Sequence, residues 1–130
     1  MVEGLDNYKF GFEKLGVWND SLDFVKEIYE LTNKFPKEEL YGLSSQLRRA
    51  AISISSNIAE GSTRKSLKDQ ARYTEIAFGS LIETLNQLII ANKLEYITIE
   101  KLEARRNQIE KISRQLNALK NSQLERFNAK

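Results

Sequence analysis

The chain has 130 residues, which is enough for one domain with its own core and too short for two ordinary ones. It contains no cysteine and no histidine, which excludes disulfides, thiolate nucleophiles, Ser-His-Asp triads and the usual zinc sites. Twenty Lys and Arg residues against 18 Asp and Glu residues give a net charge of +2, and no apolar run approaches the roughly 20 residues needed to cross a bilayer.

The composition favours a helix-rich protein without catalytic chemistry. One proline and six glycines are too few turn residues for a β-sandwich. The remaining carboxylates, lysines and tyrosines form no cluster of nucleophile, base and orienting group, so we predict no enzyme activity, no metal or cofactor and no small-molecule substrate. The N-terminus has no charged start followed by an apolar stretch and a cleavage site, so we expect a cytoplasmic protein.

The N-terminal third predicts a loose arm followed by a helix. Residues 1–13 show no helical period and contain two glycines. The first helix should begin near Leu15 and end before Pro36, because a proline disfavours helix in the residue before it. Its apolar arc is wider than one bundle face requires. One stripe is Leu15, Trp18, Leu22, Val25 and Tyr29, and the stripe beside it is Val17, Phe24, Ile28, Leu31 and Phe35.

A second helix is predicted over residues 41–61, after a short helical turn that begins at Pro36. Leu43, Leu47, Ala50, Ile54 and Asn57 alternate at intervals of four and three, which places them on one stripe. Gly61 follows at the position where a helix end favours a residue in the left-handed conformation.

Two further helices complete the pattern. Ser66 is predicted to cap the third, because Asp69 follows three residues later. Its stripe is Leu67, Ala71, Thr74, Phe78, Leu81, Leu85 and Leu88, with Ile76, Ile82, Ile89 and Ile90 beside it. The fourth helix starts at Thr98 and keeps the same spacing until a polar C-terminal tail at residues 121–130. Four helices with short connections predict an up-down-up-down bundle over residues 14–120.

The first and third helices carry spare apolar surface, which indicates contact with copies of the same chain. The interface candidates are Val17, Phe24, Ile28, Leu31, Ile76, Ile82 and Ile89. A thicker core, in which the first helix is simply the most buried element, is the alternative.

The charge is unevenly distributed, with net values of −4, +4, −3 and +5 over residues 1–40, 41–72, 73–100 and 101–130. This alternation favours attraction between neighbouring antiparallel helices and also leaves basic surfaces that could meet nucleic acid. The candidates for phosphate contact are Arg48, Arg49, Arg64, Lys65, Lys68 and Arg72. The alternative for the arginines is ion pairing with Glu75 or Glu83 or with the acidic first helix.

Asn57 and Arg105 occupy stripe positions where an apolar residue is expected, so each should have a polar partner. Local groups or solvent could satisfy them. Alternatively they fix the register or the oligomeric state, as polar seam residues do in coiled coils.

Several segments together resemble one protein family. They are LGVW at 15–18, IY at 28–29, FP at 35–36, QLRRA at 46–50, SNIAEG at 56–61, Arg64, and IAFGSL at 76–81. These segments resemble the four-helix-bundle proteins encoded by intervening sequences of bacterial 23S rRNA genes, over Phe12 to about Leu119. The resemblance implies a left-handed up-and-down bundle that assembles as a ring-shaped homopentamer and is classed as ribosomal-protein-like. Relatives include the accessory variability determinant of diversity-generating retroelements, a more basic protein that binds a reverse transcriptase and nucleic acid.

Two functional hypotheses follow. The first is a non-catalytic homo-oligomer that binds RNA or a nucleoprotein through basic surfaces of its second, third and fourth helices. The rival is a protein-protein adaptor, of the reverse-transcriptase accessory type, in which the charges serve subunit contacts. An enzyme would need an interior cluster of lysine and glutamate, and the sequence shows none.

Overall fold

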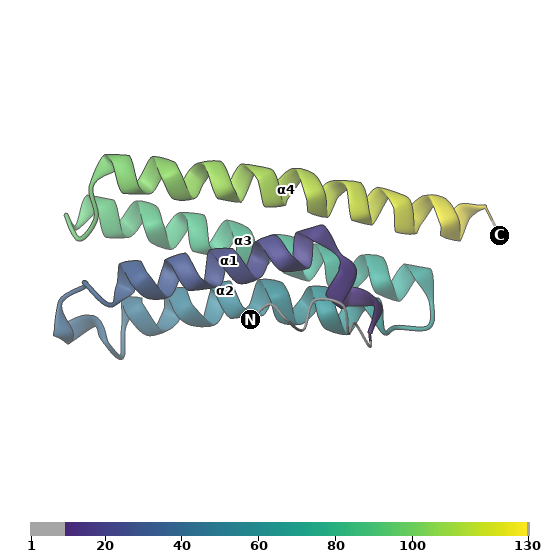
Figure 1. The fold of residues 1–130 in the computed structure, drawn as a ribbon, viewed down its shortest axis with the longest axis horizontal. Coiled ribbons are helices and arrows are strands. Elements are labelled where there is room, and N and C mark those ends of the chain that lie inside the picture. The colour runs from purple at the N-terminus through teal and green to yellow at the C-terminus, as the bar shows by residue number, and fades with distance from the viewer. Residues whose placement is uncertain (1–9, 130) are drawn as a thin grey trace.

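Four α-helices make up most of the chain. The computed structural model describes residues 10–129, and that part contains no strand. The helices are α1 (Gly16–Thr32), α2 (Leu43–Ser62), α3 (Leu67–Lys93) and α4 (Ile99–Asn128), and the short 3-10 helices η2 (Gly11–Lys14) and η3 (Lys37–Glu39) precede α1 and α2. Figure 1 shows the four α-helices lying lengthwise beside one another, with their connections at the two ends of the molecule. The all-α prediction is therefore confirmed.

All four α-helices contribute to one core. α2 packs against α1 and α3, and α4 packs against α3 and, over a smaller area, against α1. The large side chains with almost no exposure are Phe24 and Ile28 of α1, Leu47 and Ile54 of α2, Leu81 and Leu88 of α3, and Ile112 and Leu116 of α4. Burial of each such side chain contributes about 1.5–3 kcal/mol, so this shared core is the main source of stability.

The predicted cap at Ser66 and the predicted helix start at Thr98 are both confirmed. The Ser66 hydroxyl accepts a hydrogen bond of 3.0 Å from the Asp69 amide, and the Thr98 hydroxyl accepts one of 3.2 Å from the Lys101 amide. Each bond satisfies a backbone N–H that has no partner inside its helix. η3 follows directly after Pro36, where the sequence indicated a short helical turn.

The structure corrects the interface prediction for α1. Val17, Phe24, Ile28 and Leu31 are buried in the core of the single chain, so they offer no surface to a neighbouring copy. Fully buried Ser21 lies on the same stripe, and its hydroxyl donates to the Trp18 carbonyl at 2.6 Å. This small residue lets α1 lie close to its neighbours on that side. The other stripe instead leaves Leu22 and Tyr29 exposed.

Both predicted tails differ from the sequence expectation where the structure describes them. Residues 1–9 of the predicted arm lie outside the described residues, but Gly11–Lys14 form η2, and the Phe12 ring packs edge-on against Trp18 at 5.0 Å. α4 continues through the predicted tail to Asn128. Gln123 is buried there and accepts a hydrogen bond of 2.9 Å from Thr74. A polar residue on the inner face hides the helical period from the sequence pattern.

Within residues 10–129, no helix combines the length and apolar character that crossing a bilayer requires.

Candidate nucleic-acid interface

The six predicted phosphate-contacting cations fall into two groups. Arg48 and Arg49 lie in the second turn of α2, whereas Arg64, Lys65, Lys68 and Arg72 lie in the α2–α3 connection and at the start of α3. Sixteen residues separate Arg48 from Arg64. The helical part of this stretch ends at Ser62, so at 1.5 Å per residue the α2–α3 connection lies about 21 Å along the bundle from Arg48. The structure therefore brings four of the six together and leaves two apart.

Arg48 is held by the end of α1. Its Nε donates to the Thr32 hydroxyl at 2.8 Å, a terminal nitrogen donates to Asn33 Oδ1 at 2.9 Å, and the guanidinium lies 4.7 Å from the Tyr29 ring centroid. Neither Glu75 nor Glu83 is among its partners. These contacts tie α2 to the C-terminal end of α1, so Arg48 is committed to the fold. Arg49 is exposed and makes no side-chain hydrogen bond or ion pair with the described residues.

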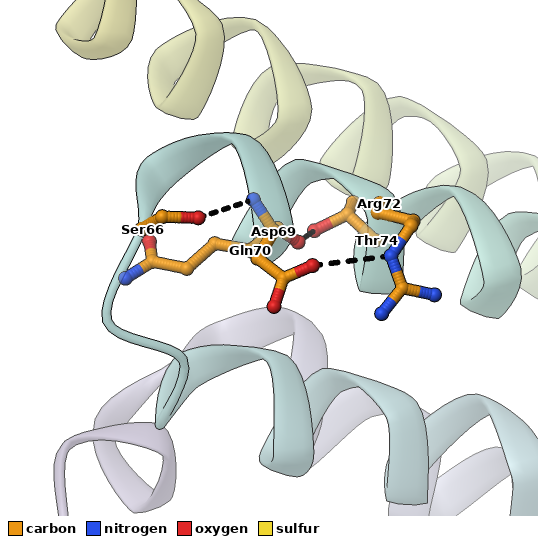
Figure 2. Close-up of polar contacts among 5 residues, drawn as sticks. All are labelled: Ser66, Asp69, Gln70, Arg72 and Thr74. Carbon is orange, nitrogen blue, oxygen red and sulfur yellow. Dashed lines mark hydrogen bonds and ion pairs between the residues drawn. The ribbon is translucent and has the colours of Figure 1, made fainter.

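The connection between α2 and α3 is short and fixed by side chains. The Thr63 hydroxyl donates to the Glu60 carbonyl at 2.7 Å, and Gln70 Nε2 donates to the Arg64 carbonyl at 2.9 Å. Figure 2 shows Ser66 and Gln70 beside this connection, with the Ser66 cap on Asp69 marked. These bonds hold the backbone that carries Arg64 and Lys65 in one conformation.

Gly61 does not adopt the predicted left-handed conformation. It is buried within α2, and no described glycine has a positive φ. A Cβ atom added at Gly61 would lie 2.6 Å from the Cβ of Tyr73. The residue is therefore needed because α3 and the Tyr73 side chain approach α2 too closely for any other side chain.

Tyr73 is the centre of the basic group. The guanidinium carbons of Arg64 and Arg72 lie 4.7 and 4.8 Å from its ring centroid, within the range of cation–π attraction. Arg72 also pairs through Nε with Asp69 at 3.1 Å, and this bond raises the pKa of Arg72 above its usual value. Arg64 Nε is buried and has no hydrogen-bond partner in the described part of the chain.

Lys65 and Lys68 are the uncommitted cations of this region. Both are exposed, and neither makes a side-chain hydrogen bond or ion pair with residues 10–129. Beside them a depression of about 410 Å³ lies between the start of α3 and the end of α4. Its charged lining consists of Lys68, Arg72 and Lys120 together with Asp69 and Glu75. We name Arg64, Lys65, Lys68, Arg72 and Tyr73 the turn cluster.

Lys120 also lies in this region, although the sequence did not predict it there. It lines the depression and pairs with Glu75 at 2.7 Å, although 45 residues separate the two in the chain. No local pattern marks it, because its place beside α3 depends on how α4 packs. From the sequence, Lys120 is only one of the positive charges in the basic segment 101–130.

Several polar side chains of α4 are paired with α1 inside the chain. Arg105 pairs with Glu27, Lys111 lies 3.3 Å from Asp20, and Gln115 donates to the same Asp20 at 2.8 Å. These contacts confirm that the acidic first segment and the basic last one attract each other. They engage Arg105 and Lys111, whereas Arg114 of α4 is exposed and has no side-chain partner among the described residues.

The comparisons with known proteins agree with this architecture. A family model described as 23S rRNA-intervening sequence protein matches residues 13–118. The chain belongs to this family. The matched range of the 23S rRNA-intervening sequence protein family includes α1, α2, α3 and the whole turn cluster, and it ends ten residues before the end of α4.

A solved structure is similar over nearly all of its own length. It is the 1.70 Å crystal structure of a protein of unknown function from the S23 ribosomal protein family of Bacteroides thetaiotaomicron VPI-5482. The two chains share 29% identity with a TM-score of 0.73, and the match covers 79% of this chain and 96% of the other. No curated protein matches the chain significantly.

In this family member the two polar seam residues have partners within the chain. Asn57 Nδ2 donates to the Ser53 carbonyl at 2.8 Å and to the Ser53 hydroxyl at 3.0 Å, and that hydroxyl lies 2.9 Å from the Ser80 hydroxyl of α3. Arg105 is satisfied in part by Glu27 across the α1–α4 contact, although its Nε has no partner among the described residues. Asn57 is thus hydrogen-bonded by groups of its own helix, and Arg105 is paired in part by the Glu27 carboxylate.

The apolar interface candidates on α3 lie at the surface. Ile76, Ile82 and Ile89 keep 41%, 45% and 41% of their surface exposed, and Ile90 beside them keeps 40%. A Cβ added at Gly79, in the middle of this face, would meet no atom within 4 Å. The face is thus open in the single chain, unlike the interface candidates of α1.

Proposed function

We propose that this protein is a non-catalytic RNA-binding bundle that contacts the phosphate backbone through its turn cluster. The names of its family and of its solved relative support a connection to ribosomal RNA or ribosomal proteins. Phosphate neutralisation by Lys and Arg needs exposed cations that are not already paired within the protein. The turn cluster offers such cations at one end of the bundle.

The observation that carries the proposal is that two lysines unpaired among the described residues lie close together at the α2–α3 connection, whereas three cations of α4 are paired within the bundle. Arg105, Lys111 and Lys120 are engaged with carboxylates of α1 and α3. Lys65 and Lys68 have no such partner in the described chain and stand on a backbone fixed by caps. Binding of a phosphate there would break no internal ion pair of either lysine.

We further propose a left-handed up-down-up-down topology and assembly as a ring-shaped homopentamer. The short connections at the two ends of the molecule in Figure 1 support the topology. The exposed isoleucines of α3 support assembly, because a monomer would leave that apolar face in water. A ring would present several turn clusters at once, and avidity would strengthen individually weak phosphate contacts.

The test is the salt dependence of binding to a structured RNA. Lys65→Glu and Lys68→Glu together should weaken binding and reduce the slope of log K against log salt, by about one unit for each lost phosphate contact. Lys37→Glu and Lys93→Glu form the matched control, because both lysines are exposed near the opposite connections and the net charge changes equally.

Equal losses in the two double variants would show that only net charge matters and would contradict the proposed surface. Light scattering must give the same mass for both variants, so that a change in assembly is not mistaken for a change in RNA contact.

The alternative is a protein-protein adaptor with no direct nucleic-acid role. The exposed isoleucine face of α3 favours it, since such a face can receive another protein as well as a second copy. If the wild-type protein binds neither RNA nor DNA at low salt, where phosphate contacts are strongest, the adaptor is the better account.

A further inference from the structure

Two guanidinium groups share one aromatic ring in the turn cluster. Arg64 approaches from the α2–α3 connection and Arg72 from the second turn of α3, and each guanidinium carbon lies less than 5 Å from the Tyr73 centroid. The two distances of 4.7 and 4.8 Å place the guanidinium carbons no more than about 9.5 Å apart, and like charges at such separations repel each other. The ring attracts each cation, but it does not supply the opposite charge that would balance the pair.

The compensation from nearby carboxylates is incomplete. Asp69 pairs only with Nε of Arg72, and Figure 2 shows the two terminal nitrogens of Arg72 extending beyond that bond. Arg64 has no carboxylate partner among the described residues, and its buried Nε lacks any hydrogen-bond partner there. A buried charged donor without a partner is unfavourable, so a ligand that accepts a hydrogen bond from Arg64 would remove this cost.

The pair is also held in place before any ligand arrives. The Arg64 amide donates to the Gly61 carbonyl at 3.1 Å, and the Arg64 carbonyl accepts from Gln70 at 2.9 Å. Gly61 allows the Tyr73 side chain to lie against α2. Stacking on that ring then restricts both long arginine side chains, which lowers the entropy cost of ordering them around a ligand.

We propose that Arg64 and Arg72, held against Tyr73, form a binding site for a single phosphate group of RNA. The planar guanidinium fork matches two phosphate oxygens, whereas a lysine offers only a point charge. Lys65 and Lys68 then provide general attraction around this site. The inference rests on the proposed function, because it names the groups that hold one phosphate within the RNA-binding surface.

Conservative substitutions separate a specific phosphate site from general attraction. Arg64→Lys and Arg72→Lys keep the net charge, and each should weaken RNA binding about tenfold, because the bidentate contact is lost. Arg114→Lys is the matched control, since Arg114 is exposed on α4 and makes no side-chain bond to the described residues. Wild-type affinity in both cluster variants would overturn the inference while leaving the proposed function intact.

The role of the ring is tested in the same assay. Tyr73→Phe keeps the ring on which both guanidinium groups lie and should keep the affinity, whereas Tyr73→Leu removes the ring and should reduce the affinity about tenfold. An equal affinity of Tyr73→Leu and wild type, with both folded by circular dichroism, would contradict a site organised by the ring.

The source of the phosphate is resolved by the RNA ends. A short oligoribonucleotide with a 3′ label is compared with a 5′-monophosphate and with a 5′-hydroxyl. If the RNA with a 5′-monophosphate binds more tightly than the 5′-hydroxyl RNA, and Arg64→Lys abolishes this difference, the site holds a terminal phosphate monoester. If the two RNAs bind equally, the site holds a backbone diester.

A final arm does not depend on RNA at all. In NMR spectra recorded at constant ionic strength, inorganic phosphate should shift the side-chain Nε–H signals of Arg64 and Arg72 but not that of Arg114. If the wild type fails to bind RNA yet these signals shift, the proposed function fails and the phosphate site stands. If inorganic phosphate moves none of them, the phosphate site itself is refuted.

Discussion

Gly61 and Gly79 show that one residue type serves different purposes on adjacent helices. A Cβ at Gly61 would lie 2.6 Å from the Tyr73 side chain, whereas a Cβ at Gly79 would meet nothing within 4 Å. Both residues lie in helical backbone, where alanine is otherwise preferred. The packing around each glycine therefore decides whether an alanine there raises or lowers the free energy of unfolding.

We expect Gly61→Ala to lower the free energy of unfolding by about 1–3 kcal/mol, because the added methyl group forces α2 and α3 apart. Gly79→Ala should raise it by about 0.5–1 kcal/mol, because alanine loses less backbone entropy. Urea unfolding at a fixed protein concentration measures both. Equal effects of the two changes would contradict the close approach at Tyr73.

Arg105 provides the second test at this scale. Its side chain is 16% exposed, while that of its partner Glu27 is 41% exposed, so solvent weakens the pair. Arg105→Leu should be neutral or slightly stabilising, because a filling apolar side chain removes the desolvation cost. Arg105→Ala should cost about 1 kcal/mol, since it removes the packed stem and leaves Glu27 unpaired.

Melting temperatures compare these variants with Arg106→Ala, which removes a more exposed pair with Glu103 one helical turn away. That control should change stability by less than about 0.5 kcal/mol. Equal, negligible effects of both Arg105 variants would show that its side chain simply reaches water.

At the scale of the elements, Glu39 joins two connections at one end of the bundle. Its carboxylate accepts a hydrogen bond of 3.0 Å from the Leu43 amide at the start of α2. It accepts a second, of 2.8 Å, from the Tyr96 hydroxyl in the α3–α4 connection. The bond from the Leu43 amide, with that from Tyr96, lowers the pKa of Glu39 below 4.5, and the bond to Glu39 raises the pKa of Tyr96. One carboxylate thus caps α2 and anchors the neighbouring turn.

This arrangement predicts a defined pH dependence. Because the folded pKa of Glu39 is lowered, its stabilising contribution is fully present above pH 4.5 and is lost as the pH falls through the lower folded value. Glu39→Gln should melt below wild type near neutral pH, and the difference should shrink in acid. A difference that stays constant down to pH 3 would contradict the role of the charge.

The starts of α3 and α4 followed from local chemistry, but the end of α4 and the buried faces did not. Ser66 and Thr98 cap their helices through their own nearest amides, so the sequence sufficed to place them. The two apolar stripes of α1 are only one residue, about 100°, apart. Burial of Ser21 between Val17 and Phe24 decides which stripe faces inward, and that depends on neighbouring helices.

The candidate site was predictable to the same extent. The cations of the α2–α3 connection are close in sequence, so their proximity in space follows directly. Arg48 looked equivalent to them but is held by Thr32 and Asn33, which only the α1–α2 contact brings near. Tyr73 was missed as the centre of the cluster, because its stacking depends on Gly61 inside α2.

For the whole molecule, we propose that the open apolar face of α3 mediates assembly. Ile82→Glu and Ile89→Glu place charges on this face without disturbing the core, since both isoleucines are about half exposed. Light scattering should give several times 15.0 kDa for the wild type and a smaller mass for the double variant, with helicity retained.

The matched control for assembly is Ile99→Glu, at the first residue of α4, where the isoleucine is exposed outside this face. It should keep the wild-type mass. A wild-type chain that is monomeric at micromolar concentration would remove the basis for the ring.

The central proposal is that RNA binds to the bundle at the turn cluster. Photo-crosslinking of bound RNA, followed by mass spectrometry of the modified peptides, tests it most directly because it reports contact rather than affinity. The account predicts crosslinks concentrated in residues 64–73, with Tyr73 the main modified residue, and their loss in Lys65→Glu/Lys68→Glu. Crosslinks confined to α1 or α4, with residues 64–73 unmodified, would contradict it.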